Sequence, residues 1–250
     1  MDETLARRLA KLNSRFYQQV SASFSATRQT GWPGWERVAH EAGLGEGAQA
    51  DVLDLACGNL RFARFLSGRG VRARVFAVDN CDELAQEGLA GEACAHYLHV
   101  DVVRALDEPG GLRRALSDVP TCDLAVCFGF LHHLAMPQHR SEVLRTLVDV
   151  VRPGGVVAVS LWQFARDERL MARAVPVDGG GEGDYLLGWQ GRKDVARYCH
   201  SFSEDEVDAL SASCASLTCE LARFSADGRT GDLNRYLVLR KNEEHPVCEG

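Results

Sequence analysis

The sequence has no long hydrophobic run and no excess of positive charge, and each absence excludes a class of protein. No apolar run reaches the roughly 18–20 residues that cross a bilayer, and the acidic start at Met1-Asp2-Glu3 is unlike a signal peptide. The formal net charge is −7 over 250 residues, whereas strong non-specific binding to free nucleic acid usually requires a basic face. We therefore expect no membrane partner, and any nucleic-acid binding must use a local basic patch or a basic partner subunit.

Paired cysteines are also absent. The chain has nine cysteines, but no two of them form a Cys-x-x-Cys pair. That spacing is typical of structural zinc sites and of redox-active disulfides, so we predict neither a metal site nor a disulfide framework. Scattered and mostly buried thiols are typical of the reducing cytoplasm, which is the expected location.

A third absence concerns glycine in the stretch 51–62. An apolar run that ends at Asp54 predicts a buried parallel strand, and a turn at Gly58 and a helix follow it. Strand, turn and helix in this order typically open a nucleotide site. A pyrophosphate requires a glycine-rich turn, but Ala56 and Leu60 stand where two of the glycines would be. A cofactor with no phosphate and with a positive charge, S-adenosylmethionine, fits this acidic strand end better.

The pattern of strands and helices predicts one α/β domain over residues 1–250, with a helical lid within 1–45. Five strand–helix units and a late hairpin predict a seven-stranded, mostly parallel sheet with an antiparallel C-terminal edge strand and helices on both faces. The sequence Arg-Pro-Gly-Gly at 152–155 predicts a turn, and residues 162–218 are long enough for an insert that shapes the substrate pocket. The predicted strands are 51–55, 74–78, 96–100, 122–127, 156–161, 219–224 and 234–240.

Aspartates end three successive predicted strands, at Asp54, Asp79 and Asp101. Asp79 lies 25 residues after Asp54, close to the roughly 20-residue spacing at which an acidic residue reaches a ribose. We expect Asp79 to accept hydrogen bonds from the ribose hydroxyls and Asp101 to accept one from the adenine amine. Asp54 is expected to face the positive charge of the cofactor.

The order of these motifs resembles that of the class I S-adenosylmethionine-dependent methyltransferases, which have a Rossmann-like fold. Residues 122–127 are similar to the fourth strand of that family, and residues 152–155 to the turn before its fifth strand. The resemblance covers about 51–240. It implies that Ala56, Gly58 and Phe128 lie beside the cofactor, although many members of the family have glycine where this chain has Ala56.

Two segments outside this common core resemble a narrower family, the tRNA wobble-uridine carboxymethyl methyltransferases. Residues 16–33 share the Tyr, Phe-Ser, Thr-Arg and Trp-Pro of that family in the same order, and residues 184–202 are similar to its Asp-x-Leu-x-Pro-Trp and Arg-Tyr-Tyr-His-x-Phe segments. Gly188 and Cys199 depart from this pattern. The resemblance implies a tRNA substrate and a small zinc-binding activator subunit as partner. It also implies that Arg28 binds the carboxylate of the cofactor.

The residues that carry the chemistry are expected after the fourth strand and on the insert. Cationic and hydrogen-bonding groups there can orient a carboxylate or bind an anticodon phosphate. A carboxylate acceptor needs no general base, because it is already ionised at neutral pH. The sequence also has neither an Asn/Asp-Pro-Pro-aromatic motif for amine methylation nor a Pro-Cys pair for carbon methylation. The four residues predicted to be catalytic are His132, Arg197, Tyr198 and His200.

Two alternatives remain open at this point. The acidic balance and the departures at Gly188 and Cys199 favour methylation of a small molecule or a lipid precursor. The departures at Ala56 and Leu60 favour a cofactor-binding subunit without activity.

Overall fold

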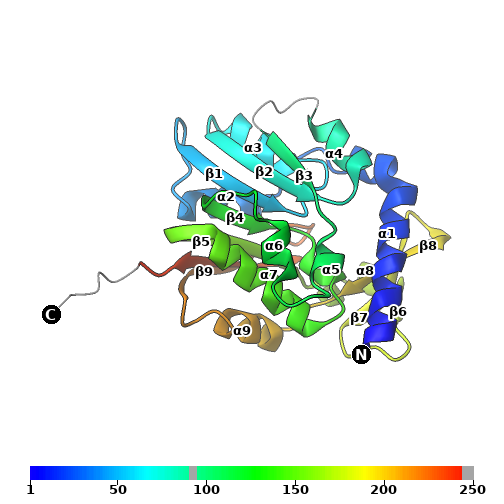
Figure 1. Cartoon of the computed structure of the whole chain (residues 1–250). Helices are drawn as coiled ribbons and strands as arrows, with labels where there is room; N and C mark the ends of the chain where they lie inside the picture. The colour runs from blue at the N-terminus through cyan, green and yellow to red at the C-terminus, as the bar shows by residue number, and fades with distance from the viewer. Residues whose placement is uncertain (90–94, 244–250) are drawn as a thin grey trace.

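The large sheet runs through the whole molecule (Figure 1). The computed structural model describes residues 1–89 and 95–243, and in that part of the chain the sheet has seven strands in the order β3-β2-β1-β4-β5-β10-β9. The strands are β1 (Gln49–Leu55), β2 (Arg72–Asp79), β3 (Ala95–His99), β4 (Cys122–Cys127), β5 (Val151–Trp162), β9 (Thr218–Ala226) and β10 (Asn234–Lys241).

The directions of these strands confirm the predicted sheet. The first five strands pair in parallel, and β10 is antiparallel both to β5 and to β9. The C-terminal strand therefore lies one place in from the edge, because β9 continues the sheet beyond it. The order of the parallel strands reverses between β1 and β4, which is the place where open α/β sheets bind ligands.

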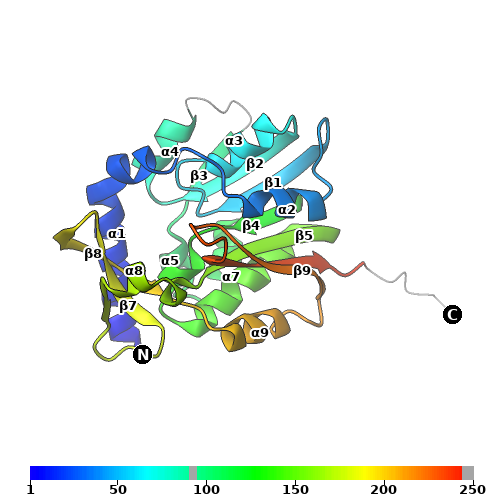
Figure 2. The same cartoon turned by 180° about the vertical axis from the view of Figure 1, so that it is seen from behind.

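Helices cover both faces of the sheet (Figure 2). The long ones are α1 (Glu3–Ala26), α2 (Gly34–Glu41), α3 (Arg61–Gly68), α4 (Asp82–Leu89), α7 (Pro137–Val150) and α9 (Glu204–Ala212). The shorter ones are α5 (Val102–Ala105), α6 (Gly111–Ala115) and α8 (Glu168–Met171), with 3₁₀ turns η1 (Leu131–His133) and η2 (Phe164–Arg166). Among the residues that the structure describes, no helix has both the length and the apolar character needed to cross a bilayer.

An apolar core lies on each face of the large sheet, between the sheet and the helices that cover it. Alternate residues of β1 show how the division arises, since Val52 packs with α2 and α3 whereas Leu53 and Leu55 pack with α6, α7 and α9. A strand that is buried on both faces needs apolar residues at successive positions. This is why the apolar run before Asp54 identified β1 in the sequence.

The Arg-Pro-Gly-Gly sequence at 152–155 was wrongly predicted to be a turn. It lies inside β5, which begins at Val151. The pairing of β4 with β5 shifts register between Cys122 and Leu124, and Gly154 has a φ of 74°. The turn-forming residues therefore produce an irregularity within the strand instead of a connection before it.

The insert at 162–218 contains a second sheet that the sequence did not predict. Its strands are β6 (Ala174–Pro176), β7 (Asp184–Trp189) and β8 (Arg192–His200), in antiparallel pairs. This sheet lies against α1 (Figure 1), where Phe16 and Val20 pack with Trp189 and Val195. The N-terminal helix and the insert thus form one wall, although they are far apart in the sequence.

Candidate active site

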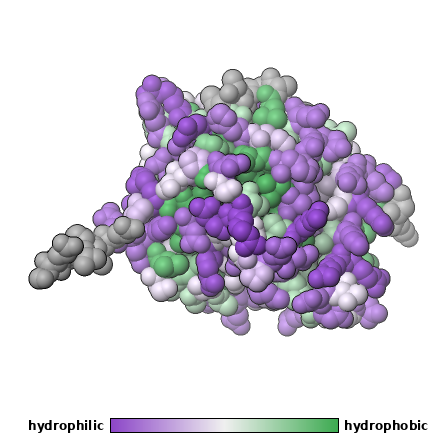
Figure 3. All heavy atoms as spheres, in the orientation of Figure 1, coloured by the Kyte–Doolittle hydropathy of each residue, from purple (hydrophilic) through white to green (hydrophobic). Residues whose placement is uncertain are grey.

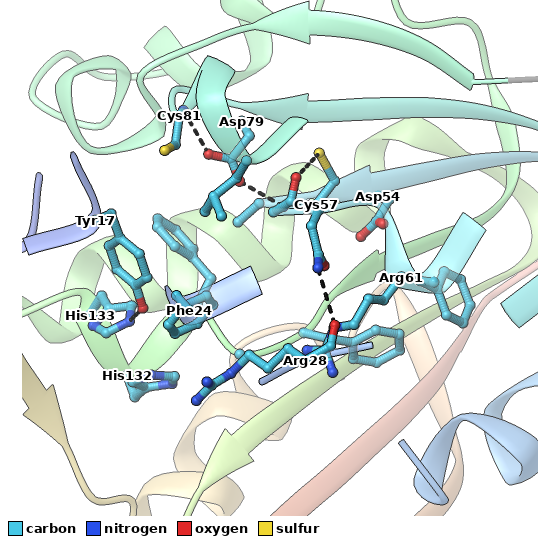
Figure 4. Close-up of a pocket in the computed structure, with 18 of the residues that line it drawn as sticks. Tyr17, Phe24, Arg28, Asp54, Cys57, Arg61, Asp79, Cys81, His132 and His133 are labelled. Atoms are coloured by element: carbon cyan, nitrogen blue, oxygen red, sulfur yellow. Dashed lines mark hydrogen bonds between the residues drawn. The ribbon is translucent and has the colours of Figure 1, made fainter. Parts of the chain in front are cut away.

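A cavity of about 930 Å³ opens at the carboxyl ends of β1, β2 and β4. Its lining comes from the large sheet, from α1 and the segment after it, and from β8. Asp54 and Asp79, near the ends of β1 and β2, lie at one side of the cavity (Figure 4). Tyr17, His132 and His133 lie at the other side.

The turn after β1 has left-handed backbone at three positions. The φ angles are 61° at Ala56, 53° at Gly58 and 55° at Leu60. A Cβ atom added at Gly58 would meet nothing within 4 Å, so this glycine faces open space. The backbone geometry is thus one that glycine adopts freely, while Ala56 and Leu60 adopt it at a cost of about 1–2 kcal/mol each. The alanine and the leucine therefore preserve the geometry of the turn, and the departures do not indicate a lost site.

Asp79 fixes the same turn from the end of β2. Its Oδ2 accepts a hydrogen bond from the Gly58 amide at 2.9 Å, and its Oδ1 accepts from the amides of Asn80 at 2.8 Å and Cys81 at 2.9 Å. Burial raises the pKa of Asp79, and these three amides oppose that shift. The carboxylate is therefore held rigidly at the cavity wall, with lone pairs left on Oδ2 for a further donor.

Asp54 is the carboxylate that lacks a partner. It is 3% exposed and lines the cavity, and its Oδ2 has no hydrogen-bond partner among the residues that the structure describes. Burial, and then the nearby charge of Asp79, raise the pKa of Asp54 to about 7, while Arg61 opposes the shift. A buried carboxylate is expected to be paired, so this position suits a cationic ligand. The sulfonium and ammonium groups of S-adenosyl-L-methionine have the required charge.

The other residues predicted for the cofactor lie around these two aspartates. Asp101 lines the cavity and is exposed, and its side chain also caps α5 by accepting from the Arg104 amide at 3.0 Å. Phe128, Ala56 and Gly58 line the cavity as well. The structure thus brings together all the residues that the sequence assigned to the cofactor; their individual roles stay predictions.

The segment after α1 is tied to the cofactor turn by Asn59. Its Nδ2 donates to Ser25 Oγ at 2.9 Å and to the Arg28 carbonyl at 3.1 Å. The Arg28 guanidinium lies 3.8 Å from the centre of the Phe24 ring and faces the cavity. Figure 4 shows the Arg28 side chain extending toward His132. Burial, and then the charge of Arg197, lower the pKa of Arg28 to about 10, so it stays charged at neutral pH.

Replacing Asn59 by alanine is expected to lower the free energy of unfolding by about 1–3 kcal/mol, because two buried hydrogen bonds are lost. Asn242→Ala is the matched control, since this exposed amide donates only one bond, to the Ser216 carbonyl at 3.3 Å; it should change stability by less than about 0.5 kcal/mol. Urea denaturation measures both values. Equal effects would show that the Asn59 amide does not hold the segment.

Tyr17 and His133 meet at the opposite side of the cavity. His133 Nδ1 lies 2.9 Å from the Tyr198 carbonyl, so it carries the proton and donates. His133 Nε2 then accepts from the Tyr17 hydroxyl at 2.7 Å. Burial, and then the charge of Arg197, lower the pKa of His133 to about 3, whereas burial raises that of Tyr17 to about 12. Both groups are therefore neutral at physiological pH and give this wall a fixed hydrogen-bond direction.

Arg197 brings a charge to this wall, and no ion-pair partner for it lies among the described residues. Its guanidinium carbon lies 4.8 Å from the centre of the Phe16 ring, 5.6 Å from Trp189 and 5.9 Å from Trp162. The side chain is buried and lines the cavity, and neither Nε nor Nη1 has a hydrogen-bond partner within residues 1–89 and 95–243. Unpaired buried N–H groups on a cation are costly, so the site suits an anion whose oxygens can accept from them.

His132 is the third polar group here. It is buried beside Trp162, with the ring centres 4.9 Å apart, and its Nδ1 has no partner among the described residues. Burial, and then the neighbouring His133 and Arg197, lower the pKa of His132 well below its usual range. It is therefore a neutral imidazole in the cavity wall.

Tyr198 and His200 lie outside the cavity lining, contrary to what their assignment as catalytic residues requires. Both ring nitrogens of His200 lie 2.7 Å from carboxylate oxygens, one of Asp184 and one of Glu206, and the Tyr198 hydroxyl donates to Asp184 at 2.6 Å. The alternation of a strand explains this, because Tyr198 and His200 point to the face opposite Arg197. We expect the two residues to hold β8 in place.

Several residues of the site had no role in the sequence prediction. Asn13 is buried and pairs with the backbone of Tyr198, donating to its carbonyl at 3.2 Å and accepting from its amide at 2.7 Å. Trp162 borders both Arg197 and His132. The available signal for Asn13 was its helical spacing from the apolar residues Leu9 and Phe16, and no local pattern indicated Trp162.

The two histidines and Cys199 also have the spacing of a metal site, since their ligand atoms lie within 4.8 Å of one another. Both nitrogens of His133 are already hydrogen-bonded, and burial raises the pKa of the Cys199 thiol. Arg28 and Arg197 line the same cavity. These surroundings favour an anion over a metal cation.

Comparison with known proteins agrees with this geometry. Residues 4–212 match the family model described as a methyltransferase domain. A protein of Encephalitozoon cuniculi that is named as a methyltransferase is 31% identical over 193 residues, which are 75% of this chain and 79% of that protein. The tRNA (carboxymethyluridine(34)-5-O)-methyltransferase of Arabidopsis thaliana is 26% identical over 183 residues, which are 71% of this chain but 38% of that relative.

The fold is also that of a solved enzyme. The structure of 1,6-didemethyltoxoflavin-N1-methyltransferase from Burkholderia thailandensis, solved with S-adenosylhomocysteine, is similar with a TM-score of 0.59 at 20% identity, over 95% of this chain and 91% of that one. The family match spans most of the chain and includes both aspartate-bearing strands. The chain therefore belongs to the methyltransferase-domain family, and it is an S-adenosyl-L-methionine-dependent methyltransferase.

Proposed function

We propose that this enzyme esterifies the carboxylate of a carboxymethyl group on the wobble uridine of tRNA. The observation that carries the proposal is the buried guanidinium of Arg197 in the cavity lining, whose Nε and Nη1 atoms have no hydrogen-bond partner among the described residues. A carboxylate oxygen can accept a charge-assisted hydrogen bond from an N–H group of this kind. The relative from Arabidopsis thaliana is named for a methyl transfer to carboxymethyluridine.

The chemistry asks little of the protein beyond positioning. S-adenosyl-L-methionine supplies a methyl group that a sulfonium has already activated. A carboxylate oxygen attacks that carbon in line, so no proton has to be removed from the acceptor. Arg197 would hold the carboxylate, and the aromatic rings around it would exclude water. Asp54 would hold the positive end of the cofactor on the other side of the cavity.

The neutral histidines support an anionic acceptor. His132 and His133 are both uncharged at neutral pH, because burial lowers their pKa values. A neutral wall leaves Arg197 and Arg28 as the charges that face the ligands from this side. Arg28 would then bind the carboxylate of the cofactor, and Arg197 would bind the carboxylate of the acceptor. Each arginine would therefore be paired with one anion.

The test is methylation of a defined tRNA. Purified enzyme is incubated with S-adenosyl-L-methionine and a tRNA that carries 5-carboxymethyluridine at the wobble position, with and without a candidate zinc-binding activator subunit. Mass spectrometry of the nucleosides should show a methyl ester at that position, and the same tRNA with plain uridine should stay unmodified. No ester in either arm would refute the proposed acceptor.

A small-molecule acceptor is the second candidate. His132 supports it, because a neutral imidazole with an unpartnered Nδ1 can form a hydrogen bond to a polar small-molecule acceptor. The net charge of −7 also makes a small ligand easier to attract than a polyanion. This candidate predicts that the enzyme leaves the tRNA unmodified but methylates a compound in a metabolite extract.

A further inference from the structure

One side of α1 carries basic side chains, most of which form no ion pair with a residue that the structure describes. The helix has four basic side chains, Arg7, Arg8, Lys11 and Arg15, and a single acidic one, Glu3. All four basic side chains are exposed. Arg7 lies 3.8 Å from Glu3, a contact that is weak because both side chains face solvent. The other three make no ion pair with any residue in 1–89 or 95–243. We call these four residues the α1 basic stripe.

Elsewhere in the protein, arginines are commonly matched by acids. Arg74 pairs with Asp51, Arg140 with Glu206 and Arg152 with Asp123. The whole chain carries a net charge of −7. The α1 basic stripe is therefore a local departure from the overall charge, and such a departure is the usual mark of a surface that binds a polyanion.

The stripe lies beside the cavity. At 100° per residue, Ala10, Ser14 and Gln18 share one side of the helix, and these three residues line the cavity. Lys11 and Arg15 come next after Ala10 and Ser14 in the sequence, so they lie on the side of the helix adjacent to these lining residues. A ligand that projects from the cavity over α1 would therefore meet the stripe first. In Figure 3, which has the orientation of Figure 1, the surface at the right, where α1 lies, is mostly hydrophilic.

The apolar side of α1 is already occupied. Leu9, Phe16 and Val20 are at most 6% exposed, and Phe16 and Val20 pack against Trp189 and Val195 of the insert. A basic helix that binds a membrane surface needs a free apolar face to insert. The stripe thus fits a polyanion that contacts charge alone, such as the phosphate backbone of a nucleic acid.

We propose that the α1 basic stripe binds the backbone phosphates of the RNA whose modified nucleotide enters the cavity. This inference rests on the proposed function and adds the surface that holds the RNA. The rise of 1.5 Å per residue gives the stripe a length of roughly 12 Å, enough for several consecutive phosphates. Docking along α1 also explains how an acidic protein can hold an RNA at all.

The test compares two triple variants with the same change in charge. R8A/K11A/R15A removes the three residues of the stripe that have no ion pair with a described residue, keeps Arg7 with its partner Glu3, and leaves the cavity lining intact. R72A/R145A/R240A removes three exposed arginines from β2, α7 and β10. The probe is an anticodon stem-loop RNA that contains 5-carboxymethyluridine, and its binding is followed by fluorescence anisotropy at several salt concentrations. Alanine keeps the helix, because it has the highest helix propensity.

The stripe variant should bind the stem-loop at least about tenfold more weakly, and its plot of log affinity against log salt should be shallower by roughly 2. Its KM for the RNA should rise by a similar factor, with kcat, the affinity for S-adenosyl-L-methionine and the rate on the free nucleoside unchanged. The control variant should match the wild type in each measurement. Equal weakening in both variants, or unchanged binding in the stripe variant, would overturn the proposal.

Two further outcomes separate this inference from the proposed function. If the wild type binds RNA through α1 but does not esterify carboxymethyluridine, the proposed acceptor is wrong and the surface stands. If the wild type esterifies the tRNA and the stripe variant does so with the same KM, the surface alone is wrong. Binding to vesicles of anionic phospholipid that the stripe variant loses, without any binding of RNA, would assign the stripe to membranes instead.

Discussion

Replacing Arg197 by methionine is expected to lower kcat/KM for the carboxymethyl acceptor by about 10²–10³-fold. The substitution keeps a long apolar side chain among Phe16, Trp162 and Trp189, but it removes both free N–H groups. A hydrogen bond to a charged group contributes about 1.5–3 kcal/mol, and each 1.36 kcal/mol of lost transition-state stabilisation is a tenfold loss in rate. Steady-state kinetics with the carboxymethyluridine tRNA measure the effect.

Two companion variants show whether the loss belongs to the acceptor. Arg197→Lys keeps the charge but replaces the planar guanidinium by a single ammonium group with donors in other directions, so it should recover only part of the activity. Arg28→Met should raise the Kd of S-adenosyl-L-methionine, whereas Arg197→Met should leave that Kd nearly unchanged. If Arg197→Met weakens cofactor binding as much as Arg28→Met does, Arg197 belongs to the cofactor site.

Replacing Asp54 by asparagine is expected to weaken binding of S-adenosyl-L-methionine by about 10–100-fold. The asparagine has the same shape but no charge, so it loses the attraction to the cationic cofactor in a buried site. Calorimetry of cofactor binding measures the change. Asp118→Asn is the control, because it removes one carboxylate at an exposed position outside the cavity lining. An unchanged affinity in Asp54→Asn would show that this carboxylate does not face the cofactor.

The same carboxylate predicts a pH dependence of cofactor binding. The pKa of Asp54 in the free protein is about 7, and the cationic cofactor favours the ionised form. Below pH 7 binding must therefore release a proton, so affinity should fall up to tenfold per pH unit as the pH decreases. Above pH 7 it should be level. Asp54→Asn should remove this slope.

The stability of the cofactor-free enzyme should change with pH in the opposite direction to cofactor affinity. Because the folded protein holds the proton of Asp54 more tightly than the unfolded chain does, the free energy of unfolding of the cofactor-free enzyme should decrease as the pH rises from about 4 to 7. Asp54→Asn should therefore be more stable than the wild type at pH 8. Thermal denaturation without cofactor at pH 5 and pH 8 measures this difference.

Much of the cofactor side could be predicted because its signals are local. Each of the strands β1 and β2 is an apolar run that ends near an aspartate, and parallel strands bring their carboxyl ends to one edge. Asp54 and Asp79 therefore had to lie close together once the strands were recognised. The left-handed backbone at Ala56 and Leu60 could not be predicted, since neither residue type favours it.

The acceptor side depended on contacts between distant segments. Arg197 was identified by its type and by resemblance, but Tyr198 and His200 were assigned to the cavity with it. Recognising residues 192–200 as a strand would have separated them, because neighbouring side chains of a strand point to opposite faces. The small sheet was not predicted. The glycine-rich segment 179–183 directly precedes β7 and makes the alternating pattern of that strand hard to recognise. The contact of Tyr17 with His133 spans 116 residues, and no local pattern encodes it.

The most direct test of the account is a crystal structure of the enzyme with S-adenosylhomocysteine and 5-carboxymethyluridine. An oxygen of the carboxylate should lie within hydrogen-bonding distance of Nε or Nη1 of Arg197, with one oxygen directed toward the sulfur of the cofactor. A nucleoside whose carboxylate points away from Arg197, with those two nitrogens still unpaired, would contradict it.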